Sequence, residues 1–205
     1  MLKQLTAPSN QKVIFGAIIA MLALPFFALA QEAVMNMGGN NAQATQWALL
    51  LAFIGAGIAT VLPCLGSILG VSLVGQAGAG LLTEKPELAG KVITLAVLPG
   101  SQGLYGMVIS LLFIFSYAPL ISEQASVSAL QGFILFASFL PVTITCLISA
   151  PYQGKVCASG LHMLAKDGRL AGRVITLAAL VETYALLGFL ISFFMLNAFK
   201  ASVIS

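Results

Sequence analysis

Four apolar runs constrain this chain more than any other feature of its sequence. They cover residues 47–82, 88–117, 128–165 and 170–200, and short polar links separate them. A helix of about 30 residues is roughly 45 Å long, which is enough to cross the hydrocarbon core of a bilayer. Because 60% of the residues are hydrophobic and only 7% are charged, the composition excludes a water-soluble fold. The sequence therefore predicts an all-α, multi-pass membrane protein.

The four runs are two copies of one unit. An offset of 82 residues places Lys91-Val-Ile-Thr-Leu-Ala-Val-Leu98 on Arg173-Val-Ile-Thr-Leu-Ala-Ala-Leu180 without gaps. The same offset pairs Cys64 with Cys146, Ser67 with Ser149, Gly106 with Gly188 and Ser110 with Ser192. Such an offset over both helices indicates a duplicated hairpin. We expect tandem transmembrane hairpins over residues 47–118 and 128–200, with the same orientation because each contains two spans.

The N-terminal 46 residues have two interpretations. Lys3 and Lys12 precede an apolar stretch that ends Ala-Leu-Ala30, as in a secretory signal peptide. The alternative is an uncleaved extra transmembrane helix, since the stretch is also long enough to span. In either case residues 31–46 are polar, and we expect them to form a short external segment.

Positive charges orient the hairpins. They gather at the two hairpin tips, as Lys85, Lys91, Lys166, Arg169 and Arg173, with Lys155 nearby in the third apolar run. Within the hairpin region Lys200 is the one exception, at the far end of the last helix. By the positive-inside rule the tips are cytoplasmic and the C-terminus is outside. We expect a multi-pass protein of a bacterial inner (plasma) membrane.

Glu182 is the one acid deep inside an apolar run. It lies about 12 residues into the fourth run, near the expected middle of the membrane. A charge there costs roughly 2.5–3.5 kcal/mol on insertion scales, so an intramembrane acid indicates an ion or proton carrier by default. The alternative is a neutral, protonated Glu182 held between helices.

Polar groups on two other helices fall at the depth of Glu182. In the first repeat its position is taken by Gly100, so each chain has one such carboxylate. Around Gly100, Pro99 lacks an N–H and is expected to free a backbone carbonyl near Leu98. The other oxygen donors are the side chains of Ser101, Gln102 and, on the third helix, Gln153, while Tyr105 can donate its hydroxyl to Glu182. These oxygens suit a hard monovalent cation. The alternative is that the Ser and Gln side chains only form hydrogen bonds between helices.

The remaining chemically reactive residues predict no further site. Cys64, Cys146 and Cys157 lie within predicted spans without metal-ligand spacing, and we interpret them as small buried residues. His162 is the only histidine and stands near a helix end. There is no P-loop and no nucleophile constellation, so we expect no nucleotide site, no catalytic residue, no cofactor and no nucleic-acid partner.

The first apolar run is rich in glycine. Gly66 and Gly70 form a GxxxG step, which lets helix backbones approach closely. We expect this helix to pack against neighbouring copies of the chain, with packing inside one subunit as the alternative.

These motifs resemble the duplicated, four-helix proteolipid (subunit K, or c-ring subunit) of V-type and A/V-type rotary ATPases. Leu98-Pro-Gly-Ser-Gln-Gly-Leu-Tyr-Gly106 is similar to the family's Leu-Pro-Gly-Thr-Gln-Gly-Leu-Tyr-Gly. Val181-Glu-Thr-Tyr-Ala185 resembles its carboxylate helix, and Gln153-Gly-Lys-Val resembles its third-helix motif. The resemblance covers about residues 47–198. Ser101 stands where the family usually has Thr, which keeps the hydroxyl and loses a methyl.

The resemblance implies a rotor. Identical copies form a membrane ring, each carrying one ion on its glutamate past a stator membrane subunit with a fixed cation, and central-stalk subunits join the ring to the sector that hydrolyses or makes ATP. In sodium-translocating members the ion ligands match Leu98, Ser101, Gln102, Gln153 and Glu182, and the residue matching Tyr105 bonds the carboxylate. We expect Na⁺ in this site, with H⁺ as the alternative ion. A small secondary transporter or a structural proteolipid is the alternative function.

Overall fold

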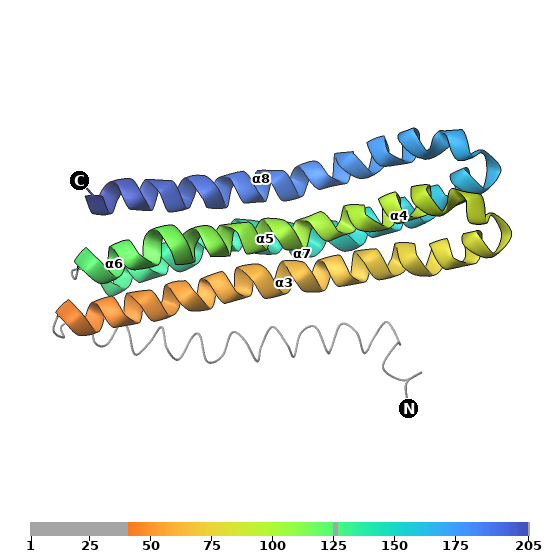
Figure 1. Cartoon of the computed structure of the whole chain (residues 1–205). Coiled ribbons are helices and arrows are strands. Elements are labelled where there is room, and N and C mark those ends of the chain that lie inside the picture. Colours follow the sequence, from red (N-terminus) through yellow and green to blue (C-terminus); the bar gives the residue numbers. More distant parts are fainter. Residues whose placement is uncertain (1–40, 125–126, 205) are drawn as a thin grey trace, which may run out of the picture.

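The computed structural model describes residues 41–124 and 127–204, and every regular element in this part of the chain is helical (Figure 1). The first span is α3 (Asn41–Glu84). The second is built from η1 (Pro86–Leu88), α4 (Ala89–Val97), η2 (Leu98–Gly100), α5 (Ser101–Leu112), η3 (Phe113–Tyr117) and α6 (Ala118–Gln124). The third is α7 (Ala129–Lys166), and η4 (Gly168–Leu170) leads into the fourth, α8 (Ala171–Ile204). These four candidate membrane spans confirm the predicted multi-pass, all-α fold. The predicted signal peptide or extra helix at residues 1–30 lies outside the described residues.

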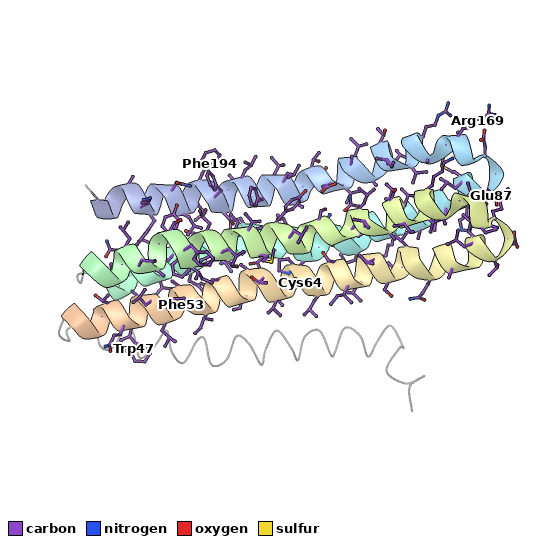
Figure 2. The ribbon with its side chains drawn as sticks, viewed as in Figure 1. Trp47, Phe53, Cys64, Glu87, Arg169 and Phe194 are labelled. Carbon is purple, nitrogen blue, oxygen red and sulfur yellow. The ribbon has the colours of Figure 1, made fainter. Side chains whose placement is uncertain are left out.

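The two hairpins lie side by side with their tips at the same end (Figure 1). Glu87 and Arg169 mark this end, and Trp47 lies at the other (Figure 2). The tips are tied together by two lysines of the first hairpin. Lys85 Nζ donates to the carbonyl oxygen of Ala165, and Lys91 Nζ donates to that of Gly168 at 2.9 Å. The repeats are therefore parallel, as the sequence predicts.

The central interface joins α3 and α7, which are the first helices of the two hairpins. A Cβ on Gly154 of α7 would lie 2.5 Å from Gly70 Cα, so only glycine permits this approach. A Cβ on Gly66 would lie 2.6 Å from the carbonyl oxygen of Leu147. The Gly66–Gly70 step thus serves packing within one chain, which is the alternative that the sequence left open, and packing of this helix against neighbouring copies stays a prediction.

Each outer span packs on the inner helix of its own hairpin through a glycine. A Cβ on Gly106 of α5 would lie 1.9 Å from the carbonyl oxygen of Ala59 in α3. The corresponding pair in the second repeat is Gly188 of α8 and Pro141 of α7. A Cβ on Gly188 would lie 2.7 Å from the carbonyl oxygen of Pro141. The duplication therefore extends from the sequence to the packing, and it brings α5 against α8 at the middle of the bundle.

Two helices are longer than the sequence suggests. Residues 41–46, expected in an external polar segment, form the first turns of α3, where Thr45 is buried and its hydroxyl donates to Val127 O at 3.4 Å. The second span does not end at Tyr117 but passes through a π-helical turn into α6. The reason is that Phe113, Tyr117 and Ile121 are all buried in one apolar cluster, so the core continues beyond the expected end.

Candidate ion-binding site

Glu182 lies on the face of α8 that meets α5, and its side chain is only partly exposed. One carboxylate oxygen, Oε1, accepts two hydrogen bonds from α5. The Ser101 hydroxyl donates to it at 2.7 Å, and the Tyr105 hydroxyl donates at 2.5 Å. Ser101 and Tyr105 are four residues apart, so the helical repeat of α5 places both hydroxyls on one face.

Two glutamines complete the site on the interior side of the carboxylate, and both are fully buried. Gln153 Nε2, on α7, donates to Glu182 Oε2 at 3.3 Å and to the carbonyl oxygen of Ala178 at 3.2 Å. Gln102 Nε2, on α5, donates to Gln153 Oε1. These bonds use the amide nitrogens of both glutamines. Gln102 Oε1 is left buried with no hydrogen-bond partner in the structure.

Leu98 takes part through its backbone. Pro99 sits in the 3₁₀ turn η2, and the carbonyl oxygen of Leu98 accepts from the Ser101 N–H across that turn. It also lies 2.9 Å from the Ser101 hydroxyl oxygen. This differs from the freed carbonyl that we expect from Pro99, because the 3₁₀ turn supplies a new donor. A carbonyl oxygen has two lone pairs, and this one faces the same hydroxyl as Glu182.

Within the described residues, no salt bridge reaches Glu182. The ion pair in this part of the chain joins Arg169 to Asp167 at the second tip, where the Arg169 hydrogen bonds lower the pKa of the Asp167 carboxyl. No cluster of three His, Cys, Asp or Glu side chains is found there either, so a transition-metal site has no support in these residues. The site thus combines one carboxylate with neutral oxygens and amides, a donor set suited to a single monovalent cation or a proton.

Sequence reasoning missed two groups that support the site. The Ser67 hydroxyl, on α3, accepts from the Gly103 N–H at 2.9 Å and so anchors the start of α5 beside Gln102. The carbonyl oxygen of Ala178 holds the amide of Gln153. Ser67 is one of the repeat-paired residues, which is a usable signal, whereas nothing in a sequence marks one backbone carbonyl. Cys146 and Cys157 are buried as predicted, while Cys64 is partly exposed.

Fold and site together define an integral, multi-pass membrane protein made of two parallel hairpins, with a hydrogen-bonded carboxylate inside its last span. The chain belongs to the ATP synthase C subunit family, whose sequence model matches twice, at residues 54–113 and 136–195. The two matches are separated by the same 82 residues as the repeat. They confirm the duplicated proteolipid hairpins to which the sequence motifs point.

Among individual proteins, the chain is similar to named subunits of V-type ATPases and of an A-type ATP synthase. It is 42% identical over 151 residues to the V-type sodium ATPase subunit K of Enterococcus hirae, covering 73% of this chain and 93% of that protein. It is 32% identical to the A-type ATP synthase subunit K of Methanocaldococcus jannaschii, covering 75% of this chain and 66% of that protein. It is 28% identical to the c' subunit of the V-type proton ATPase of Candida glabrata, covering 76% of this chain and 93% of that protein.

Proposed function

We propose that this chain is the membrane rotor subunit of a V-type or A-type rotary ATPase, and that it carries Na⁺ across the membrane on Glu182. Copies of the chain form a ring, and a cationic residue of a stator membrane subunit displaces the ion as each site passes. Two findings support the rotor: the double family match and the similarity to subunit K proteins. ATP hydrolysis or synthesis takes place in other subunits.

The unpartnered side-chain oxygen of Gln102 is the observation that favours Na⁺ over H⁺ as the carried ion. Leaving a buried acceptor without a partner costs about 1–3 kcal/mol, which a protein tolerates where a ligand supplies the missing interaction. This oxygen lies on the amide that bonds Gln153, next to the carboxylate of Glu182. A bound cation would take up this oxygen together with those of Leu98, Ser101 and Glu182. A proton on Glu182 would satisfy only one acceptor. A site that binds only a proton would therefore leave the oxygens of Leu98, Ser101 and Gln102 without a role in binding.

The names of the similar proteins point to different transported ions. The name of the Enterococcus hirae protein specifies sodium, while the Candida glabrata protein, at lower identity, is named for protons. H⁺ is therefore the alternative ion for this chain. Departure from the usual Thr at Ser101 does not weaken the sodium assignment, because the hydroxyl is the group that contacts Glu182.

The geometry suits loading and unloading from the side of the bundle. Glu182 is partly exposed, whereas Gln102 and Gln153 behind it are fully buried. A stator cation can therefore reach the carboxylate from the outer face and release the ion without opening the α3–α7 interface. With the basic hairpin tips cytoplasmic, central-stalk subunits would bind at the tips, in a bacterial inner membrane.

Labelling of Glu182 by dicyclohexylcarbodiimide tests the ion. This apolar reagent modifies a protonated carboxyl in lipid, so an ion that occupies the site slows the reaction. At fixed pH and ionic strength, we expect replacement of potassium by sodium to slow labelling, and we expect the protection to weaken as pH falls because protons compete for the carboxylate. A labelling rate that does not respond to sodium would contradict the sodium assignment and leave a proton rotor.

A further inference from the structure

The second span changes its helical geometry beside the ion site. The 3₁₀ turn η2, which contains Pro99, ends at Gly100, and α5 begins at Ser101. N–H groups in the first turn of a helix have no carbonyl partner within that helix, and the side chain of the preceding residue often accepts from one of them. Gly100 occupies this capping position and has no side chain to offer. An acceptor for the first turn of α5 therefore has to come from η2 or from another helix.

The first turn of α5 uses both of these sources. The Ser101 N–H donates to the carbonyl oxygen of Leu98 across η2. The Gly103 N–H donates to the hydroxyl oxygen of Ser67, on α3, at 2.9 Å. Ser67 is buried, and the two helices lie close together here, since a Cβ on Gly103 would lie 3.2 Å from the Ser67 hydroxyl oxygen. Ser67 thus caps α5 from a neighbouring helix.

The second repeat shows the same serine beside an unbroken helix. Ser149 of α7 is the counterpart of Ser67, and Ala185 of α8 is the counterpart of Gly103. Because α8 continues through this region, the N–H of Ala185 lies inside a regular helix. Ser149 Oγ is buried and has no hydrogen-bond partner among the described residues. The bond that Ser67 makes therefore belongs to the break in the second span and is not a general feature of the hairpin.

We propose that Ser67 is a positioning residue of the ion site, and that its hydroxyl keeps the side-chain oxygen of Gln102 in place for sodium. This inference rests on the proposed function, because it assigns a role in binding the carried ion. Gln102 directly precedes Gly103 in the first turn of α5. A bond to the Gly103 N–H therefore restrains the backbone from which the Gln102 side chain projects.

The side chain of Gln102 has little freedom to correct a shift of its backbone. It is fully buried, and its amide nitrogen donates to Gln153 Oε1 on α7. Its own oxygen, Oε1, has no hydrogen-bond partner among the described residues. Binding groups work best when they are held within about 0.5 Å of their productive positions. Ser67 therefore acts on sodium affinity through Gln102 without being a ligand.

The carboxylate depends less on this anchor. Ser101 and Tyr105 donate to Glu182 Oε1 at 2.7 and 2.5 Å. A proton binds to the carboxylate alone, whereas sodium also uses the oxygen of Gln102. Loss of the Ser67 hydroxyl therefore weakens sodium binding more than proton binding, so this residue shifts the selectivity of the site toward sodium.

Carbodiimide labelling of Glu182 in the purified, assembled ring tests this role. We expect Ser67→Ala to raise the sodium concentration for half-protection roughly two- to tenfold, the range that corresponds to one hydrogen bond between uncharged groups. Without sodium, the dependence of the labelling rate on pH should match the wild type, because the carboxylate and its two hydroxyl donors are unchanged. Ser67→Thr keeps the hydroxyl and should be half-protected near the wild-type sodium concentration. Ser67→Cys, whose sulfur is only a weak acceptor, repeats the test if Ser67→Ala assembles poorly.

The matched control is Ser149→Ala, which removes the counterpart hydroxyl and should leave half-protection unchanged. An equal rise in Ser67→Ala and Ser149→Ala, or a changed pH dependence without sodium, would show a general loosening of the helices and overturn the positioning role. An intact Ser67→Ala ring that is half-protected at the wild-type sodium concentration also overturns it, and leaves the sodium rotor standing. A wild-type ring that sodium does not protect overturns the sodium site and the role of Ser67 together.

Discussion

Replacing Ser101 by alanine separates the role of its hydroxyl from that of the fold around it. The hydroxyl oxygen lies 2.7 Å from Glu182 Oε1 and 2.9 Å from the carbonyl oxygen of Leu98, so it is central to the proposed ligand set. Ser101→Ala removes one oxygen and leaves the helix intact, since alanine has the highest helix propensity. Ser101→Thr keeps the oxygen and is the matched control.

The contacts that remain around Glu182 in Ser101→Ala determine how much sodium affinity the variant loses. A hydrogen bond to a charged group contributes about 1.5–3 kcal/mol, and 1.4 kcal/mol corresponds to a tenfold change in affinity. Tyr105 and Gln153 still contact Glu182 in the variant. We therefore expect the lower end of the range, which is about a tenfold rise in the sodium concentration needed for half-protection of Glu182.

The assay is the rate of carbodiimide labelling of the purified ring over a sodium titration, at constant pH and ionic strength. Ser101→Ala should still be labelled in the absence of sodium, because Glu182 is unchanged. Ser101→Thr should stay close to the wild type. If Ser101→Ala is half-protected at the wild-type sodium concentration, the hydroxyl is not a ligand and the argument from its position is refuted.

Three further variants test other parts of the structure. Glu182→Gln keeps the side-chain shape without the charge, so transport should be lost while rings of native size still form; transport near the wild-type rate would refute the carrier role. Gly154→Ala places a methyl 2.5 Å from Gly70 Cα, and we expect a loss of about 1–3 kcal/mol or more, seen as a lower melting temperature in detergent. Gly172→Ala, with no atom within 4 Å of its Cβ, is the control and should melt like the wild type. Lys85→Met removes the bond to the Ala165 carbonyl, so trypsin should cut the second tip roughly two- to tenfold faster; an unchanged rate would show that the bond contributes little.

The repeat made most of the fold predictable. Residues such as Gly106 and Gly188 are paired by the 82-residue offset, and the structure uses both at the same helix contact. The ends of helices were harder to predict. Tyr117 precedes a polar link, yet it is buried with Phe113 and Ile121, and tertiary packing of this kind carries a helix past the point where local sequence favours an end.

The candidate site was predictable as a set of residues but not as a set of bonds. Depth along the helices brought Ser101, Gln102 and Gln153 to the level of Glu182, and the structure places them in one hydrogen-bonded group. The direction of each amide depends on neighbours from three helices, so no single segment determines it. The Leu98 carbonyl illustrates the limit, because the 3₁₀ turn that Pro99 induces provides that carbonyl with a donor of its own.

Equilibrium binding of radioactive sodium to the purified ring tests the central claim most directly. We predict one sodium ion per chain near neutral pH, loss of that binding as pH falls, and no binding by Glu182→Gln rings of native size. Carbodiimide labelling of the same preparation verifies that Glu182 is intact and accessible. A ring that is labelled normally at Glu182 but binds no sodium would contradict the account and identify the carried ion as the proton.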